Sequence, residues 1–451
     1  MNVKPKLPKG FRDFDSKTLE KREYIIKIIS DVFKSYSFQK IETPSVESIE
    51  TLSGKYGDEA DRLIFKILNS GNYLSDYDLN NNLDYKELTR FISKKALRYD
   101  LTVPLARYIS QNINNISFPF KRYQMQNVWR ADKPQKGRFR EFMQCDADII
   151  GSKNLINEYE LVRIYDKVFE KLNLAGTIIS INSRKILTAV SSKLNVEDKF
   201  SEFVILLDKY DKIGKIKFIE ELKNFNISKE DSDFLIKIIE NPDLDYIKSY
   251  LSEFEINSEG FDECKYIFEK LKLTSNFCEI KFNFKLARGL DYYTGTIFEV
   301  ENSKVKIGAL GGGGRYDNLT SIFGNNELSG VGVSFGLDRI YYCLSELSLF
   351  KSSNELNKTL FLNFGERELN YNLKVLDVFR DSGISATIYP DFSKIKKQMN
   401  YANNLNYKFV VICGENEIKS KMVTLKNMIT GDQITDKVEK IIKLILSEKT
   451  D

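Results

Sequence analysis

A basic segment from Lys121 to Arg140 is the densest group of residues with obvious chemistry. It contains seven Lys or Arg residues and one Asp among twenty residues, a local net charge of +6. Because guanidinium groups bind phosphate oxygens bidentately, this segment suits a triphosphate or the end of a nucleic acid. The alternative is a solvated hairpin loop. Arg130 directly follows Trp129, the end of a predicted strand, where a charge near a core is costly without an anionic partner. We therefore favour an anion site.

The residues after this segment alternate as a strand does. From Glu141 to Asp148, a two-residue period sends Phe142, Gln144, Asp146 and Asp148 to one face. An aromatic ring can stack on a base, and an amide with a carboxylate can bind an ammonium or imidazolium group. We expect the floor of a pocket here, with an exposed sheet face as the alternative.

Two further segments combine charged groups with small or aromatic residues. In residues 98–104, the same alternation groups three side chains, Arg98, Asp100 and Thr102. In residues 286–296, an arginine precedes a glycine and two tyrosines, which are Arg288, Tyr292 and Tyr293. The second segment predicts a backbone turned tightly around a ligand. An ordinary strand edge or turn is the alternative for both.

Two glycine-rich segments allow close approach of the backbone to a ligand. Residues 311–314 are four consecutive glycines, for which a flexible linker is the alternative. Residues 330–339 predict a glycine-rich strand that runs into a helix near Asp338 and Arg339. This segment does not match G-x-G-x-x-G, and no G-x-x-x-x-G-K-[ST] occurs, so neither a dinucleotide-binding nor a P-loop site is supported. The pattern still suits a nucleotide packed flat on a sheet.

The absence of histidine restricts the chemistry more than any other count. The chain has 0 histidines, which excludes Ser-His-Asp catalysis, Cys-His catalysis and His-ligated zinc. Any reaction must use positioning, Arg or Lys electrostatics, carboxylates, tyrosines or a hard metal ion. The 5 cysteines are far apart and form no C-x-x-C pair, which argues against disulfides or zinc and fits a reducing cytoplasm.

Length and composition indicate a folded, multidomain chain. The 451 residues are enough for two to four domains of about 150 residues. The 68 Lys and Arg against 64 Asp and Glu give a net charge of +4, and 42% hydrophobic residues are typical of globular proteins. Residues 1–14 do not resemble a signal peptide, and no stretch of 18 apolar residues occurs, so we expect neither secretion nor a membrane span.

The periodicity of apolar residues divides the chain into zones. We expect helices and strands in the first zone and helices alone in the second. Strands are expected again after the second zone. A polar linker then precedes alternating strands and helices, which predict a largely parallel sheet. The expected helices are 19–36, 157–172, a helical module over 185–277, one from 337, 368–381, 393–405 and 438–447. The expected strands are 37–44, 64–68, 97–101, 123–129, 142–150, 177–182, 278–286, 295–300, 331–335, 360–364, 385–389 and 409–413.

Taken in order, these segments resemble the histidyl-tRNA synthetases, a family of class II aminoacyl-tRNA synthetases, over essentially the whole chain. Thr43-Pro44 is similar to motif 1, residues 130–148 to motif 2 and residues 330–339 to motif 3. Residues 288–296 and 309–317 resemble the two histidine-specific signatures, and these are the most specific part of the match.

The resemblance implies an α+β catalytic domain built on an antiparallel sheet, a helical insertion and a C-terminal α/β anticodon-binding domain. The expected boundaries are 1–184 and 278–350 for the catalytic domain, 185–277 for the insertion and 358–451 for the anticodon-binding domain. It also implies a cytoplasmic homodimer with motif 1 at its interface.

The implied reaction activates histidine with ATP and Mg²⁺ to histidyl-adenylate, releases pyrophosphate, and esterifies the 3′ end of histidine tRNA. Adenylate formation is an in-line displacement in which charge grows on phosphorus, so arginines and a metal ion can stabilise it without imidazole. The resemblance assigns no magnesium ligands here.

The resemblance also implies roles for single residues. The catalytic arginines are Arg130 at the α-phosphate, Arg288 and Arg339; ATP is bound by Arg130, Arg138, Phe142 beneath adenine, and Arg339. The histidine α-amino group meets Asp100, Thr102 and Gln144; Asp148 and Tyr293 read the imidazole, with Arg288 and Tyr292 also in the pocket. The tRNA acceptor end meets Lys133, Gln135 and Arg140. Asp100 and Asp148 stand where several relatives carry Glu.

Two other functions remain as alternatives. A regulatory paralogue of ATP phosphoribosyltransferase shares the catalytic fold and senses histidine, but it usually lacks the anticodon domain and has eroded signatures. A free-standing RNA-binding role is the other alternative. Residues 358–451 and both signatures favour the synthetase.

Overall fold

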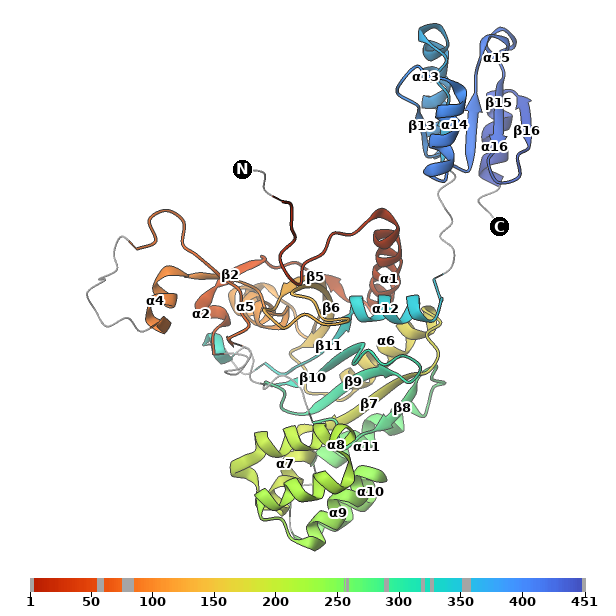
Figure 1. The fold of residues 1–451 in the computed structure, drawn as a ribbon. Coiled ribbons are helices and arrows are strands. Elements are labelled where there is room, and N and C mark those ends of the chain that lie inside the picture. The colour runs from red at the N-terminus through yellow and green to blue at the C-terminus, as the bar shows by residue number, and fades with distance from the viewer. Residues whose placement is uncertain are drawn as a thin grey trace. The chain divides into compact units, whose positions relative to one another are not determined.

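The computed structural model describes residues 4–54, 61–74, 85–254, 256, 259–287, 292–317, 321–324, 328–350 and 358–447. The chain forms two compact units, residues 1–349 and 350–451. Each unit has its own sheet (Figure 1). Each also has its own buried core.

An eight-stranded sheet forms the centre of the first unit. Its order is β1 (Gln39–Lys40), β5 (Phe120–Trp129), β6 (Glu141–Ile150), β11 (Gly330–Gly336), β10 (Gly311–Tyr316), β9 (Thr296–Asn302), β7 (Thr177–Ser183) and β8 (Glu279–Phe282). All pairs from β5 to β7 are antiparallel, whereas β1 with β5 and β7 with β8 are parallel. The predicted antiparallel sheet is therefore confirmed, with one parallel pair added at each edge.

Helices cover one face of this sheet. The three helices α1 (Ser16–Ser35), α6 (Ile156–Lys171) and α12 (Leu337–Glu346) contact one another or the sheet. The ring of Phe335 lies 5.8 Å from Phe33, 4.6 Å from Tyr165 and 5.9 Å from Phe169. α1 begins after Asp15, whose side chain accepts a hydrogen bond from the Thr18 amide. Because the odd-numbered residues of β11 pack under these helices, its even-numbered residues face the opposite side.

A small sheet of β2 (Val46–Ser48), β4 (Lys95–Leu97) and β3 (Lys66–Ile67) lies beside α2 (Ile49–Leu52), α4 (Tyr85–Ile92) and α5 (Thr102–Asn112). The strand predicted over 97–101 is wrong, because β4 ends at Leu97 and Thr102 begins a helix. Asp100 causes this change, since its Oδ1 accepts a hydrogen bond from the Val103 amide, 3.1 Å away, at the start of α5. Strand alternation therefore does not group Arg98 with Asp100.

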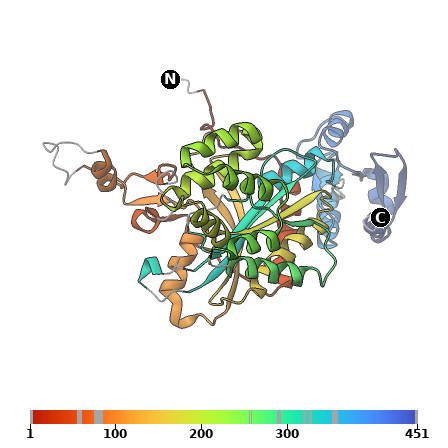
Figure 2. The ribbon, with the colours of Figure 1, turned by 90° about the horizontal axis from the view of Figure 1, so that it is seen from below.

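In the described part of the segment between β7 and β8, five α-helices form where a helical module is predicted. They are α7 (Arg184–Lys193), α8 (Phe200–Leu222), α9 (Lys229–Glu240), α10 (Leu244–Ser252) and α11 (Glu259–Leu271), and Figures 1 and 2 show them in green as one group. Ser228 caps α9 by accepting a hydrogen bond from the Asp231 amide. Their apolar core continues into Phe282 and Phe284 of the sheet region. The first unit is thus one compact body.

The second unit has a five-stranded sheet in the order β13 (Ala386–Ile388), β12 (Thr359–Phe361), β14 (Phe409–Ile412), β15 (Val423–Asn427) and β16 (Gln433–Asp436). Its helices are α13 (Glu366–Asp381), α14 (Ile395–Asn404), α15 (Glu415–Ser420) and α16 (Val438–Ser447). The parallel prediction holds for β13, β12 and β14, but β15 and β16 are antiparallel. The sequence predicted neither β15 nor β16, and the residues of β16 are mostly exposed and lack an apolar pattern.

Four short 3₁₀ helices complete the described elements: η1 (Ile113–Asn115), η2 (Glu197–Lys199), η3 (Lys223–Phe225) and η4 (Ser321–Phe323). In the part of the chain that the structure describes, no helix has the length and apolar character needed to cross a membrane.

Candidate active site

Strand register builds the face of the central sheet that lies opposite α1, α6 and α12. Asp146 on β6 lies opposite Ser334 on β11, and Asp148 lies opposite Gly332. On its other side, β6 pairs with β5, which places Arg122 opposite Asp148. Side chains at alternate positions share a face, so Phe142, Gln144, Asp146 and Asp148 line cavities on this face, as their alternation predicts.

Glycines on β10 and β11 keep this face hollow. A Cβ atom on Gly332 would lie 2.0 Å from Oδ1 of Asp148, and one on Gly314 would lie 2.9 Å from the Tyr293 ring. The glycine run 311–314 is therefore a strand of the sheet and not a flexible linker.

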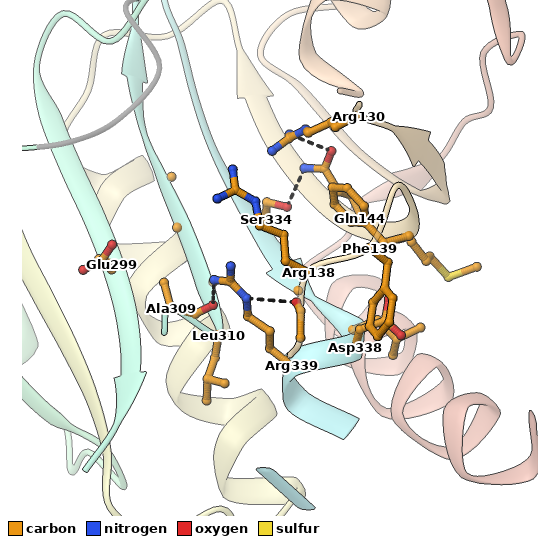
Figure 3. Close-up of a pocket in the computed structure, with 18 of the residues that line it drawn as sticks. Arg130, Arg138, Phe139, Gln144, Glu299, Ala309, Leu310, Ser334, Asp338 and Arg339 are labelled. Carbon is orange, nitrogen blue, oxygen red and sulfur yellow. Dashed lines mark hydrogen bonds between the residues drawn. The ribbon is translucent and has the colours of Figure 1, made fainter. Parts of the chain in front are cut away.

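A cavity of about 410 Å³ opens over this floor (Figure 3). Three arginines from separate segments line it: Arg130 after β5, Arg138 in the loop between β5 and β6, and Arg339 in the first turn of α12. Phe142 and Glu299 also lie on its wall. Three guanidinium groups around one cavity suit a polyanion such as a triphosphate.

Each arginine is held by specific contacts. Nε of Arg130 donates to the Tyr99 carbonyl oxygen at 3.1 Å, and its guanidinium lies 4.4 Å from the Tyr99 ring centroid. Nε and Nη2 of Arg138 donate to Asp132 at 2.8 and 2.9 Å. Nη1 of Arg339 donates to the carbonyl oxygen of Ala309 at 2.7 Å. These contacts leave Arg130 and Arg339 without an ion pair among the described residues.

Burial lowers the pKa of Arg339, and the nearby positive charges of Arg138 and Arg130 lower it further. Such mutual repulsion costs free energy in the ligand-free protein. A bound anion removes this cost, which is the electrostatic signature of an anion site.

A smaller cavity of about 60 Å³ adjoins the first and shares Gln144, Tyr293, Gly312 and Ser334 with it. Its remaining walls are mostly polar and carry three carboxylates. These walls are Asp100, Thr102, Asp146, Asp148, Tyr292, Tyr316, Gly332 and Val333. Because the two cavities share these residues, a ligand in one cavity would lie next to a ligand in the other, beside Gln144 and Gly312.

Asp148 is held on both sides in the smaller cavity. Its Oδ2 lies 2.7 Å from Nη2 of Arg122, which is fully buried, and its Oδ1 accepts a hydrogen bond from the Tyr316 hydroxyl. Burial raises the pKa of Tyr293 and Tyr316, and neighbouring carboxylates add to the effect, so both hydroxyls stay protonated.

The structure brings most of the predicted site residues together. Those lining the larger cavity are Arg130, Arg138, Phe142 and Arg339; those lining the smaller one are Asp100, Thr102, Asp148 and Tyr292; Gln144 and Tyr293 line both. Arg288 lies outside the described residues.

Other predicted residues lie elsewhere. Lys133 and Gln135 are exposed on the loop between β5 and β6 and line neither cavity. Nε of Arg140 donates to the Asp132 carbonyl oxygen at 3.1 Å. Arg98 is buried and donates to the carbonyl oxygens of Thr43 and Asn127 at 2.7 and 2.8 Å, so it fixes the backbone and does not reach the pocket.

Three residues of the smaller cavity were given no individual role by the sequence. Asp146 was expected on the pocket floor, since it lies on the same alternating face as Gln144 and Asp148. Ser334 and Tyr316 lie in segments similar to motif 3 and to the second signature, but their place in the cavity depends on pairing between strands more than 160 residues apart in sequence.

Comparisons with known proteins agree with this geometry. The family model for histidyl-tRNA synthetase matches residues 87–340, and that for the anticodon binding domain matches residues 358–448. The chain is 49% identical to the histidine–tRNA ligase of Christiangramia forsetii, over 96% of this chain and 97% of that one. It is 48% identical to the histidine–tRNA ligase of Phocaeicola vulgatus, with the same coverage.

A solved structure supports the same assignment. The crystal structure of histidyl-tRNA synthetase from Nostoc sp. PCC 7120 matches with a TM-score of 0.82 and 27% identity, over 99% of this chain and 100% of that one. The family model covers more than half of this chain, and the matches to curated relatives run nearly its full length. The chain therefore belongs to the histidyl-tRNA synthetase family.

Proposed function

We propose that this protein activates histidine with ATP to histidyl-adenylate and transfers the histidyl group to the 3′ end of histidine tRNA. The observation that carries the proposal is the pair of joined cavities, one lined by three arginines and the other by three carboxylates. A triphosphate complements the first cavity, and an amino acid with a cationic α-amino group complements the second.

ATP would occupy the larger cavity. Phe142 would stack beneath adenine, Arg130 would hold the α-phosphate, and Arg138 and Arg339 would contact the remaining charge. As charge grows on phosphorus during in-line displacement, these fixed guanidinium groups would stabilise it in a partly water-excluded site. We assign Arg288, which lies outside the described residues, to the same phosphate and to the histidine carboxylate.

Histidine would occupy the smaller cavity. Asp100, Thr102 and Gln144 are the proposed partners of the α-amino group; Tyr292 lines the same cavity, and its hydroxyl donates to Asp100 at 3.4 Å. Asp148 and Tyr293 are the proposed readers of the imidazole. A pocket that hydrogen-bonds a ring rejects an apolar side chain, because buried polar groups would be left unpaired.

Magnesium would enter with ATP. Magnesium prefers oxygen ligands and is usually held by one or two carboxylates together with phosphates and water. Glu299 is a carboxylate on the wall of the larger cavity, and it is our candidate ligand. The ion would neutralise charge on the pyrophosphate that leaves.

The tRNA would reach the site through the loop between β5 and β6. Lys133 and Gln135 are exposed there, and Arg140 lies at the base of the same loop, so we propose that these three meet the acceptor end. Residues 358–451 would bind the anticodon region. In the transfer step, an oxygen of the adenylate phosphate would take the proton of the 3′ hydroxyl.

We also propose the domain boundaries and assembly that the family implies. The catalytic domain would comprise 1–184 and 278–350, the insertion 185–277 and the anticodon-binding domain 358–451. The protein would act in the cytoplasm as a homodimer through the segment that contains Thr43 and Pro44, which sedimentation equilibrium can test.

Pyrophosphate exchange tests the proposed function. We expect exchange of labelled pyrophosphate into ATP with histidine and with no other amino acid. A histidine-sensing regulatory protein would bind histidine without exchange, and an RNA-binding protein would do neither. The match of residues 358–448 to an anticodon-binding model favours the enzyme over the regulatory protein.

A further inference from the structure

Asp146 lies at the centre of the sheet face beneath the smaller cavity. Its strand neighbours are Gln124 on β5 and Ser334 on β11. The residue is 3% exposed and lines the smaller cavity together with Asp148.

One oxygen of Asp146 is not satisfied by the protein. Oδ1 is buried and has no hydrogen-bond partner among the described residues, and the Ser334 hydroxyl is the hydrogen-bond partner found for this carboxylate in that part of the chain. In Asp148, Tyr316 donates to Oδ1; Oδ2 also lacks a hydrogen bond among the described residues, but it lies 2.7 Å from Nη2 of its ion-pair partner Arg122, whereas Asp146 has no ion pair in that part of the chain. A buried acceptor without a donor costs about 1–3 kcal/mol, which a ligand N–H would recover.

The charges around Asp146 do not neutralise it. The smaller cavity has three carboxylates, while the nearby cation, Arg122, is already the ion-pair partner of Asp148. Burial raises the pKa of Asp146 to about 7, with Asp148 and Asp100 adding to the effect and Arg122 opposing it. The charged, titratable or hydrogen-bonding groups described around it are Asp100, Arg122, Cys145, Asp148, Tyr165, Tyr293 and Ser334.

We infer that Asp146 is a specificity-determining residue whose free carboxylate oxygen accepts a hydrogen bond from a ring N–H of the substrate histidine. The inference rests on the proposed function, since it concerns the same amino-acid pocket. The cavity is small, its inner wall offers an unused acceptor, and imidazole is a short ring that carries an N–H donor. Asp146 would then act beside Asp148, whose position the protein itself fixes.

Two substrates separate this role from a structural one. The probes are L-histidine and 3-(4-thiazolyl)-L-alanine, whose ring has a similar shape but has sulfur in place of the N–H. We expect Asp146→Ala to lower kcat/KM for histidine about 100-fold and to change that for thiazolylalanine little, so that discrimination falls about 100-fold. Asp146→Asn keeps the size and one oxygen, and should lower discrimination about 10-fold.

Asp166→Asn is the matched control. Asp166 is also a buried carboxylate, 1% exposed, but it accepts from the amides of Phe277 and Cys278 and lines neither cavity. This variant should lower the unfolding midpoint and leave the discrimination between the two substrates unchanged.

Nitrogen NMR of bound, ¹⁵N-labelled histidine gives a second readout that does not depend on turnover. The chain has 0 histidines, so in selectively labelled samples every imidazole signal belongs to the substrate. A carboxylate partner raises the pKa of an imidazole, and Asp146→Asn should therefore lower the pKa of the bound ring.

Unchanged discrimination in both folded Asp146 variants, together with an unchanged pKa of the bound ring, would overturn the inference. Histidine-dependent exchange would persist in that case, so the proposed function would stand. Absence of exchange in the wild-type protein would instead refute the proposed function itself.

Discussion

Nη2 of Arg12 lies 2.9 Å from Oδ1 of Asp338, the residue directly before Arg339. The same guanidinium lies 3.2 Å from the ring centroid of Phe139, in the loop between β5 and β6. In addition, the carbonyl oxygen of Gly10 accepts a hydrogen bond from the Arg140 amide at 3.0 Å. The N-terminal segment thus links the loop that carries Arg138 to the helix that carries Arg339.

Replacing Arg12 should therefore impair the use of ATP more than the binding of histidine. We expect Arg12→Gln to lower kcat/KM for ATP about 10-fold, because a small displacement of a catalytic group is costly, and to leave the KM for histidine nearly unchanged. Pyrophosphate exchange measures both. Lys27→Gln, which removes an exposed pair with Asp31, is the control and should have no effect. Equal effects on both substrates would contradict the link to Arg339.

Removing the Asp148 side chain should instead impair the binding of histidine more than the binding of ATP. We expect Asp148→Ala to raise the KM for histidine on the order of 100-fold, while ATP binding changes little. The variant also leaves buried Arg122 without its partner, which should lower the free energy of unfolding by about 3 kcal/mol. Tyr316→Phe keeps the ion pair and tests the hydroxyl alone. A similar loss for both substrates would refute the assignment of Asp148 to histidine.

Gly332→Ala should act through Asp148 without changing any polar group. The added Cβ would lie 2.0 Å from Oδ1 of Asp148, so the carboxylate must move. We expect the KM for histidine to rise about 10-fold or more, with a smaller change for ATP. Unaltered histidine binding, measured by calorimetry on the folded variant, would show that the position of Asp148 does not matter.

Asp146 should also make the stability of the ligand-free protein depend on pH. Burial raises the pKa of Asp146 from its ordinary value of 3.8 to about 7, so the folded state binds a proton that the unfolded state releases. Its contribution to stability is therefore complete below pH 4 and is lost as the pH rises through 7. Between pH 5 and pH 8, the advantage of Asp146→Asn over the wild type should grow by about 1 kcal/mol or more. Urea unfolding at both pH values checks this, and a constant difference would contradict it.

The buried pair of Arg315 and Glu158 should dominate the stability of the second histidine signature. Nε and Nη2 of Arg315 lie 2.5 and 2.7 Å from the two carboxylate oxygens of Glu158, which is fully buried. Arg315→Met leaves that charge uncompensated and should cost about 3–5 kcal/mol, whereas the double variant with Glu158→Leu should recover much of the loss. Urea unfolding measures both, and an additive double variant would contradict coupling.

The periodicity of apolar and polar residues predicted the helices and strands whose pattern lies within one continuous segment. The alternation from Phe142 to Asp148 identified a strand face, and the apolar period of α1 and α6 identified helices. Thr102 was misassigned because it begins α5, where the Asp100 carboxylate accepts a hydrogen bond from the Val103 amide, so strand alternation does not apply. The hairpin of β15 and β16 was missed because most of β16 is exposed and shows no apolar alternation.

The resemblance predicted most residues of the candidate site. The prediction was incomplete for residues that only the pairing of strands brings into the site. Whether an oxygen of Asp146 lacks a hydrogen bond depends on the residues around it. One of these is Ser334, which lies 188 positions further along the chain and pairs with Asp146 across β6 and β11. Sequence alone gives no register between β6 and β11, so it cannot tell a satisfied carboxylate from an unsatisfied one.

Arg130→Ala tests the central claim most directly, namely that guanidinium groups stabilise the phosphorus centre without a protein imidazole. The measurement is histidine-dependent pyrophosphate exchange, with an unfolding curve to verify that the variant is folded. We predict a loss on the order of 10³-fold in kcat, since a lost electrostatic contact in the transition state has this effect. Exchange at the wild-type rate in the folded variant would contradict the account.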